Sequence, residues 1–247
     1  MKILGVFCLI NPHLLNYNLK MKIKEFLIRE TKGFNLFEKV FFPFEILLII
    51  AISIILNDDK IALISAIAGI SYTILAGKGK ISCYFIGLCG TFCYCYIAYK
   101  NGFYGNLALY GLYFFPMQVI GIFKWAKKLN KQTGEVIKTC LTKKERIMYF
   151  SLLSLATIIF GFILNSLGGK TPFIDSTTTL FSILGQILTV KRCIEQWYVW
   201  FVVNLLTLFM WIIAYMNGSN CLATIIMWAT YVFLALYFLK KWQKEIS

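Results

Sequence analysis

Long apolar blocks divide this chain, and each is close to the length that a helix needs to cross a lipid bilayer. The hydrocarbon core of a bilayer takes about 20 consecutive apolar residues in a helix. Glycine, asparagine and proline residues stand between the blocks, where turns are expected. The sequence therefore predicts an all-α integral membrane protein with about eight transmembrane helices. The expected spans are Leu36–Leu56, Ile61–Leu75, Ile81–Tyr99, Leu107–Trp125, Ile147–Leu167, Phe173–Val190, Trp197–Met216 and Cys221–Leu239.

Two of these spans depart from the pattern. The first contains Glu38, Lys39 and Glu45, and the second is short. Charged residues inside a span are costly unless they are paired. The plain expectation for Glu45 is therefore an ion pair with a lysine.

The composition agrees with a membrane protein. Hydrophobic residues make up 59% of the 247 residues and charged residues 15%, whereas about a quarter of the residues in soluble proteins are charged. The net charge of +14 does not indicate nucleic-acid binding, because the basic residues flank the apolar blocks and no sizeable soluble region remains.

The sequence offers little for metal, redox or enzymatic chemistry. Four of the eight cysteines, Cys83, Cys89, Cys93 and Cys95, lie in one apolar block, no CxxC pair occurs, and His13 is the single histidine. Neither a Walker motif nor a Ser/His/Asp set is present. We expect no cofactor, no metal and no enzymatic activity, and we expect the cysteines to pack as small apolar residues.

The distribution of lysine and arginine predicts the orientation. With the N-terminus in the cytoplasm and eight spans, 22 of the 25 basic residues fall on the inner side, and Lys60, Lys100 and Lys170 fall on the outer side. Such an excess is typical of cytoplasmic loops. Both termini are therefore expected in the cytoplasm, and residues 1–35 are expected to form a leader or a basic interfacial helix.

An internal repeat relates two parts of the chain. Ile97–Gly102 (IAYKNG) recurs 116 residues later as Ile213–Gly218 (IAYMNG), and the same offset places Gly69 on Gly185. The repeat predicts two parallel three-helix units, a symmetry on which transporters are built, with a substrate site between them. The expected units are an additional span at 36–56, a first repeat at 57–125, a cytoplasmic linker and connecting helix at 126–167, a second repeat at 168–242 and a tail at 243–247.

Polar and aromatic residues inside the spans are the candidates for binding a solute. On the seventh span, Trp197, Trp200, Asn204, Thr207 and Trp211 follow at spacings of three and four residues, which places them on one helical face. Tryptophan faces suit a flat cation, and asparagine offers donors and acceptors. The alternatives are membrane-interface anchors and a hydrogen bond between helices.

Further candidates lie in other spans. Gln118 and Gln186 are amides in the middle of the fourth and sixth spans, and each could line a cavity or bond a neighbouring helix. Pro116 is expected to loosen the helix beside Gln118. Asp175 is at the outer start of the sixth span, where helix capping is its plain interpretation. Pathway-lining candidates are Thr207, Asp175, Thr179 and Tyr84.

One long motif resembles a known family. Residues 175–204 contain the basic pair Lys191-Arg192 followed by Glu195, Trp197, Trp200 and Asn204. This pattern resembles the PnuC family of bacterial vitamin transporters, and Pro116–Gly121, with Trp125 beyond it, also looks like that family. The resemblance extends over residues 60–242. Cys193 departs from the family pattern, which has an aromatic residue at this position and so leaves the local packing open.

The resemblance implies a fold, a function and a site. The fold would be a SWEET-like 3+1+3 core with an extra N-terminal span. The function would be uptake of nicotinamide riboside across the bacterial inner membrane by facilitated diffusion, with a cytosolic nicotinamide riboside kinase trapping the substrate for NAD synthesis. A homotrimer is also implied. The substrate-binding residues implied are Trp197, Trp200, Asn204, Gln118 and Gln186.

Two other functions stay open. Thiamine is also a flat cation and riboflavin is flat and neutral, so a related vitamin transporter fits the same pattern. A membrane sensor or scaffold that transports nothing would need a sizeable cytosolic module, and the longest soluble stretches are the leader and the Ala126–Glu145 linker.

Overall fold

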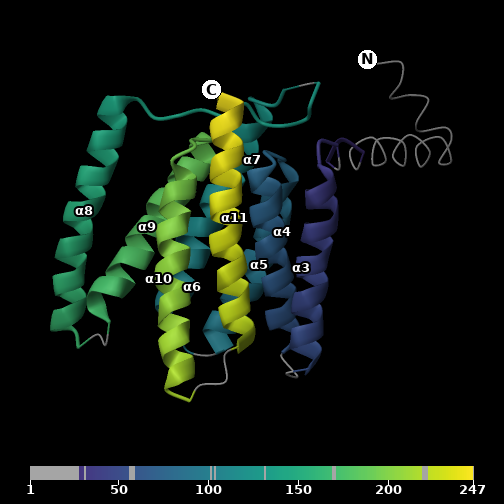
Figure 1. The fold of residues 1–247 in the computed structure, drawn as a ribbon. Helices are drawn as coiled ribbons and strands as arrows, with labels where there is room; N and C mark the ends of the chain where they lie inside the picture. Colours follow the sequence, from purple (N-terminus) through teal and green to yellow (C-terminus); the bar gives the residue numbers. More distant parts are fainter. Residues whose placement is uncertain are drawn as a thin grey trace, which may run out of the picture.

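The computed structural model describes residues 28–30, 32–55, 59–100, 102, 104–130, 132–168, 171–218 and 222–246. Within these ranges the chain is helical, with two isolated β-bridges and no strand. The expected leader and its histidine, His13, lie almost entirely outside the described residues. The helices run side by side along one common direction (Figure 1). Their bounds are α3 Leu36–Ile55, α4 Lys60–Gly77, α5 Ser82–Lys100, α6 Tyr104–Ala108, η1 Leu109–Phe114, α7 Phe115–Ala126, α8 Lys143–Ser166, α9 Pro172–Lys191, α10 Gln196–Met216 and α11 Leu222–Ile246.

Seven segments of the described chain are long and apolar enough to cross a membrane. They begin at Lys60, Ser82, Tyr104, Lys143, Pro172, Gln196 and Thr224. The eighth expected span corresponds to α3, which has 20 residues but contains Glu38, Lys39 and Glu45. The structure thus has an all-helical, multi-pass architecture with seven such segments and one more helix of similar length.

Neighbouring helices pack in an order that is not purely sequential. Consecutive pairs α4–α5, α8–α9, α9–α10 and α10–α11 pack together, but α7 also packs on α9, and α11 packs on α4. Helix α3 lies against α4 and α11. Helix α8 stands at the edge of the molecule beside α9 (Figure 1). The last helix of each expected repeat therefore contacts the first helix of the other.

A π-helical turn interrupts the third spanning segment. Pro116 has no N–H to donate, and regular α-helical hydrogen bonding resumes at this point in α7. Before it, the N–H of Phe115 bonds to the carbonyl of Tyr110, five residues back. The hydroxyl of Tyr113 leaves the helix and donates to the Ile183 carbonyl on α9 at 2.7 Å. The expected irregularity near Pro116 is therefore a π-turn that contacts a neighbouring helix.

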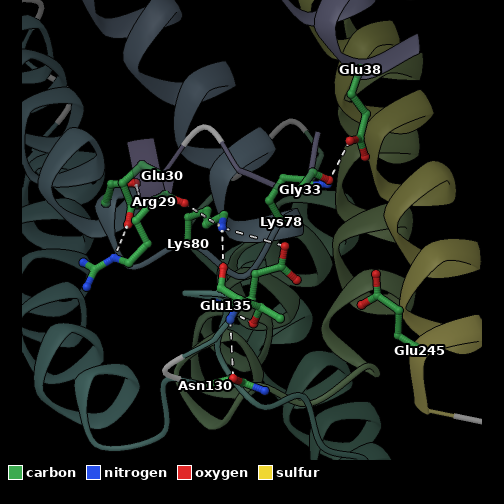
Figure 2. A network of polar contacts seen from close by, with 12 residues as sticks. Arg29, Glu30, Gly33, Glu38, Lys78, Lys80, Asn130, Glu135 and Glu245 are labelled. Atoms are coloured by element: carbon green, nitrogen blue, oxygen red, sulfur yellow. Dashed lines mark hydrogen bonds and ion pairs between the residues drawn. The ribbon is translucent and has the colours of Figure 1, made fainter. Parts of the chain in front are cut away.

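The α4–α5 turn is the centre of a polar network (Figure 2). The Lys78 ammonium is buried and donates to the Glu38 carboxylate at 2.8 Å, and Lys241 on α11 donates to the same carboxylate at 2.5 Å. The buried Lys80 ammonium donates to the carbonyls of Arg29 and Thr133 at 3.0 and 3.1 Å. These contacts tie the start of α3, the α4–α5 turn, the linker and the end of α11 together.

The linker between α7 and α8 contacts the ends of both expected repeats. The N–H of Val136 donates to the Gly79 carbonyl at 2.8 Å. Three residues later, Thr139 exchanges backbone hydrogen bonds with Arg192 and Ile194 at 2.9 Å each. The linker therefore crosses from the α4–α5 turn to the α9–α10 turn at the same end of the bundle.

The interpretation of Glu45 as a lysine partner is wrong. Its carboxylate is buried between α3 and α11 and accepts a hydrogen bond from the Thr230 hydroxyl at 2.8 Å. The ion pairs with lysine are formed instead by Glu38, which lies about two helical turns earlier on α3. Spacing along α3 does not reveal which carboxylate lies level with the lysines of the α4–α5 turn and of α11.

Candidate functional site

Two buried glutamine side chains lie on different helices, and each has a free polar atom. Gln118 on α7 donates from its amide nitrogen to the Thr91 hydroxyl on α5 at 2.8 Å. Gln186 on α9 accepts at its amide oxygen from the Tyr72 hydroxyl on α4 at 3.4 Å. The amide oxygen of Gln118 and the amide nitrogen of Gln186 have no hydrogen-bond partner among the described residues. A buried polar atom without a partner is costly, so both atoms indicate a polar ligand.

Gly87 on α5 brings the surroundings of the two amides together. A methyl group at this position would lie 2.7 Å from Cδ2 of Tyr72 and 3.0 Å from Oε1 of Gln118. The Tyr72 ring therefore lies beside the first glutamine, while its hydroxyl reaches the second, Gln186. Residues from α4, α5, α7 and α9 thus form one site.

The indole of Trp200 on α10 lies flat against α9. Its Nε1 donates to the Thr189 hydroxyl at 3.2 Å. A methyl group at Gly185 would lie 2.9 to 3.2 Å from three atoms of the indole, so only glycine leaves room for the ring. The side chain is half-buried, and it stacks on no other aromatic ring among the described residues. Trp200 therefore keeps a ring face that a flat ligand can cover.

Trp197, three residues earlier, has a different environment. It is buried between Phe238 and Trp242, with ring centroids 5.3 and 5.7 Å away. Its indole nitrogen has no hydrogen-bond partner in the described part of the chain. The faces of this ring are occupied by α11, so Trp197 can offer a ligand its N–H group more readily than its ring face.

Asn204 is buried between α10 and α11. Its amide nitrogen donates to the Tyr231 carbonyl at 3.1 Å. Thr207, one turn further, is half-buried and donates to the Val203 carbonyl of its own helix at 2.8 Å. Asn204 therefore forms the hydrogen bond between helices that was its alternative interpretation. Its amide oxygen remains available as an acceptor.

The other predicted pathway residues lie on both sides of this region. Tyr84 is fully buried, packs edge-on against Trp125, and has a hydroxyl without a partner among the described residues. Asp175 accepts from the Thr171 hydroxyl at 3.0 Å at the start of α9. Thr179 is half-buried one turn further along that helix. The expectation that Asp175 caps the helix is therefore wrong. Thr171 is at the cap position of α9, and Asp175, inside the first turn, accepts from its hydroxyl and, within the described part of the chain, from no backbone N–H at the helix start.

A separate cavity of about 230 Å³ lies between α3, α4 and α11. Its lining is mostly apolar and includes none of the predicted site residues. Ile49, Ser53, Leu63 and Met227 are among the residues that line it.

Free polar atoms gather on the residues that the sequence singles out. Buried side-chain polar atoms that have no hydrogen-bond partner within the described ranges include one on each of four residues, Tyr84, Gln118, Gln186 and Trp197. Those four atoms are a hydroxyl, one amide oxygen, one amide nitrogen and an indole nitrogen. All of these side chains are uncharged, so the site is built to hydrogen-bond and stack, and has no built-in acid or base pair.

Four supporting residues were missed by the sequence reasoning. Tyr72, Thr91 and Thr189 supply the hydroxyls that hold the glutamines and Trp200, and Gly87 supplies the space. A hydroxyl inside an apolar helix gives no strong signal, because most such groups bond to their own backbone. The 116-residue repeat was the one available signal for Thr189, since it aligns this residue with Thr73 in the other unit.

The described residues offer no metal centre. Among them, no three His, Cys, Asp or Glu side chains are grouped so that they could hold a metal ion.

Comparisons with known proteins match nearly the whole described chain. The family model described as nicotinamide mononucleotide transporter matches residues 59–244. The nicotinamide riboside transporter PnuC of Neisseria mucosa is 32% identical over 203 residues, which are 80% of this chain and 77% of that protein. The protein of the same name from Haemophilus influenzae is 33% identical over 192 residues, 77% of this chain and 82% of that protein.

A solved structure has the same fold. It is a crystal structure of the vitamin B3 transporter PnuC, and it matches with a TM-score of 0.77 at 30% sequence identity. The match covers 89% of this chain and 96% of that one. The family model includes every residue of the site described above, from Tyr72 to Tyr231. The chain therefore belongs to the PnuC family of membrane transporters.

Proposed function

We propose that this chain carries nicotinamide riboside across the bacterial inner membrane by facilitated diffusion. The names of the relatives support the substrate, and the site supports it independently. Nicotinamide riboside has a carboxamide, a cationic aromatic ring and a ribose, and each of these groups has a chemical counterpart among the residues of the site.

The observation that carries the proposal is the pair of free amide atoms. Gln118 offers an acceptor, Oε1, and Gln186 offers a donor, Nε2, and both are buried without a partner in the described chain. A carboxamide has one N–H₂ donor group and one carbonyl acceptor. A carboxamide bound between the two helices would satisfy both glutamines at once, and this removes the cost of leaving them unpaired.

The remaining groups of the substrate fit the residues of α10. The half-buried face of Trp200 suits the pyridinium ring, since a cation over an indole face is attracted by about 0.5–2 kcal/mol. The amide oxygen of Asn204 and the N–H of Trp197 suit ribose hydroxyls. Thr207, Thr179, Asp175 and Tyr84 would line the path on either side.

The uncharged site favours the riboside over the mononucleotide that appears in the family description. A phosphate group requires charge-assisted hydrogen bonds, usually from arginine or lysine. Gln118, Gln186, Trp200 and Asn204 supply none. We therefore expect nicotinamide mononucleotide to bind much more weakly than nicotinamide riboside.

We further propose a SWEET-like 3+1+3 core of two parallel units, 57–125 and 168–242, joined by residues 126–167. The packing of α7 on α9 and of α11 on α4 supports this arrangement, because a two-fold relation exchanges these pairs. The site then lies between the units, as expected for transporters built from repeats. We assign α3 as an eighth span, at 36–56, outside the repeat, and residues 243–247 as a short tail.

We place the linker end of the bundle, with both termini, in the cytoplasm. The α4–α5 turn and the linker, which both carry lysines in their sequences, lie at this end together with the C-terminus of α11 (Figure 1). The excess of basic residues on this side supports the orientation. The leader, residues 1–35, would then lie in or near the cytoplasm.

We propose that no ion gradient drives transport. Coupled carriers use membrane-embedded acidic residues to bind the ion, whereas the residues at this site are neutral. Net uptake would follow from phosphorylation of the substrate by a cytosolic nicotinamide riboside kinase. A homotrimer is proposed from the family resemblance, and the largely exposed apolar surface of α8 leaves room for a neighbouring copy.

The alternative substrates are thiamine and riboflavin. Thiamine would use the indole face of Trp200 but has no carboxamide for Gln118 and Gln186, and riboflavin lacks the positive charge. A sensor or scaffold without transport is the third candidate, and the polar site between the helices does not favour it.

Binding to the purified protein tests the proposal. Tryptophan fluorescence in detergent is followed during titration with nicotinamide riboside, thiamine, riboflavin and nicotinamide mononucleotide. We expect saturable quenching by nicotinamide riboside alone, weakened at least about tenfold in Gln118→Leu and Gln186→Leu. Gln132→Leu, in the exposed linker, is the matched control and should bind as wild type. Saturation by thiamine or riboflavin instead would overturn the named substrate.

A further inference from the structure

Thr189 on α9 connects Trp200 to two other parts of the protein. It is almost fully buried, and its hydroxyl donates to the Gly185 carbonyl at 2.8 Å while accepting from Nε1 of Trp200 at 3.2 Å. Its backbone carbonyl accepts from Nε1 of Trp125 on α7 at 3.0 Å. One residue therefore holds an indole from each of the two expected repeats.

The direction of each hydrogen bond at Thr189 is fixed. A hydroxyl has one hydrogen, and here it is used on the carbonyl one turn back. An indole can donate but cannot accept, so the bond from Trp200 must run toward the hydroxyl oxygen. Gly185 also contacts the indole of Trp200. Rotation of the Trp200 side chain would therefore break both its hydrogen bond to Thr189 and its contact with Gly185.

The fixed ring packs against α9 at the level of one of the two amides. Gln186 follows Gly185 directly on α9, and its free amide nitrogen is part of the carboxamide site proposed above. A carboxamide held by Gln186 would bring the attached ring to the level of α9 at which the indole packs. Cation–π attraction requires the cation to lie over the face of the ring, so the benefit depends on the orientation of Trp200.

We propose that Thr189 is a positioning residue that holds Trp200 flat, and that this gives the site its preference for a cationic ring over a neutral ring of the same shape. This inference rests on the proposed function. It assigns a role to a residue that does not need to touch the substrate, and it predicts discrimination between the oxidised, cationic nicotinamide riboside and the reduced, neutral dihydronicotinamide riboside.

The repeat provides a matched control. Thr73 on α4 is related to Thr189 by the 116-residue offset and donates to the Gly69 carbonyl at 3.0 Å, the same bond within a helix. No indole donates to Thr73 in the described structure. Thr73→Val therefore removes an equivalent hydroxyl without changing the support of a tryptophan.

The experiment measures binding of the two ligands by isothermal titration calorimetry, with the full chain in detergent. We expect wild type to prefer the cationic riboside by about 2- to 30-fold, the range that cation–π attraction provides. Thr189→Val should lower this preference toward one, Thr189→Ser should keep it, and Thr73→Val should leave it as in wild type. If the valine variant does not fold, Thr189→Cys tests the same point, because a thiol is a weak acceptor.

A double-mutant cycle separates positioning from general packing. Phenylalanine has no N–H, so adding Thr189→Val to Trp200→Phe should change the preference no further. Equal weakening of both ligands by Thr189→Val, or the same preference in all variants, would overturn the inference while leaving the proposed function intact. If wild type binds neither ligand, the proposed function and this inference both fail.

Discussion

Trp125 and Trp242 are both fully buried, and each donates its indole N–H to a backbone carbonyl of a helix from the other part of the chain. Trp125 on α7 donates to Thr189 on α9 at 3.0 Å, and Trp242 on α11 donates to Gly77 on α4 at 2.7 Å. The two residues are 117 positions apart, close to the offset of the internal repeat. Their reciprocal contacts are what a bundle of two related, interlocked units requires.

We predict that both tryptophans are needed for stability to a similar degree. Trp125→Phe and Trp242→Phe each remove the indole N–H that donates to a backbone carbonyl of the other unit, at a cost of about 0.5–1.5 kcal/mol for the hydrogen bond. Thermal unfolding in detergent should show a lowered midpoint for both variants. Tyr99→Phe, at an exposed position, is the control and should unfold as wild type. A loss in one tryptophan variant alone would contradict the reciprocal arrangement.

Space at two glycines is predicted to be essential for binding. A methyl group at Gly185 would collide with Trp200, and one at Gly87 would collide with Tyr72 near Gln118. We expect Gly185→Ala and Gly87→Ala to weaken binding of nicotinamide riboside by at least about tenfold, since small displacements at a binding site are costly. Gly105→Ala on α6 meets nothing within 4 Å and should bind normally. Wild-type affinity in Gly185→Ala would show that the indole does not need its present position.

The carboxylate of Glu38 is predicted to hold the linker end of the bundle together. It is fully buried and pairs with Lys78 and Lys241, so Glu38→Gln would leave two ammonium groups with no opposite charge (Figure 2). Breaking a buried ion pair by removing one partner costs about 3–5 kcal/mol. We expect a large fall in the unfolding midpoint of Glu38→Gln. Asp59→Asn, at an exposed pair with Lys100, should change it little. Equal midpoints in the two variants would rule out this role for Glu38.

The stability of the protein is predicted to rise with pH in the alkaline range because of Lys78. Burial lowers the pKa of Lys78, although Glu38 opposes the shift, and an unfolded lysine has a pKa near about 10.4. Between the lowered folded pKa and about 10.4, the unfolded chain binds more protons than the folded one. The free energy of unfolding therefore increases with pH across this window.

The comparison of wild type with Lys78→Met isolates this effect. Unfolding midpoints measured between about pH 7 and 10 should rise more steeply, or fall less, in wild type than in the variant. Parallel profiles would show that Lys78 does not titrate in this range in the folded protein.

The sequence predicted the helices well because a bilayer restricts what a span can be. The span expected at Trp197–Met216 is α10, Gln196–Met216, and that expected at Phe173–Val190 is α9, Pro172–Lys191. Length and apolar content are properties of a single helix, so they can be predicted from its own residues without knowing how the helices pack. The partner of Glu45 depends instead on which residue of α11 lies level with it, and there the expectation of a lysine was wrong.

The site could be predicted in part. The polar residues within spans gave Gln118, Gln186 and Asn204, because a buried amide is unusual enough to notice. The spacing of Trp197 and Trp200 did not show that α11 covers one ring and leaves the other accessible. The hydroxyl of Thr189 could not be read as a support for Trp200, since Trp200 lies on another helix, α10.

Transport into liposomes tests the central claim most directly. The purified protein is reconstituted without ATP or an ion gradient, and entry of radiolabelled nicotinamide riboside is followed over time. We predict that the label enters until its internal and external concentrations are equal, that unlabelled nicotinamide riboside competes, and that thiamine, riboflavin and nicotinamide mononucleotide do not. Failure of the label to enter liposomes that contain folded protein, or entry only when an ion gradient is imposed, would contradict facilitated diffusion of nicotinamide riboside by this chain.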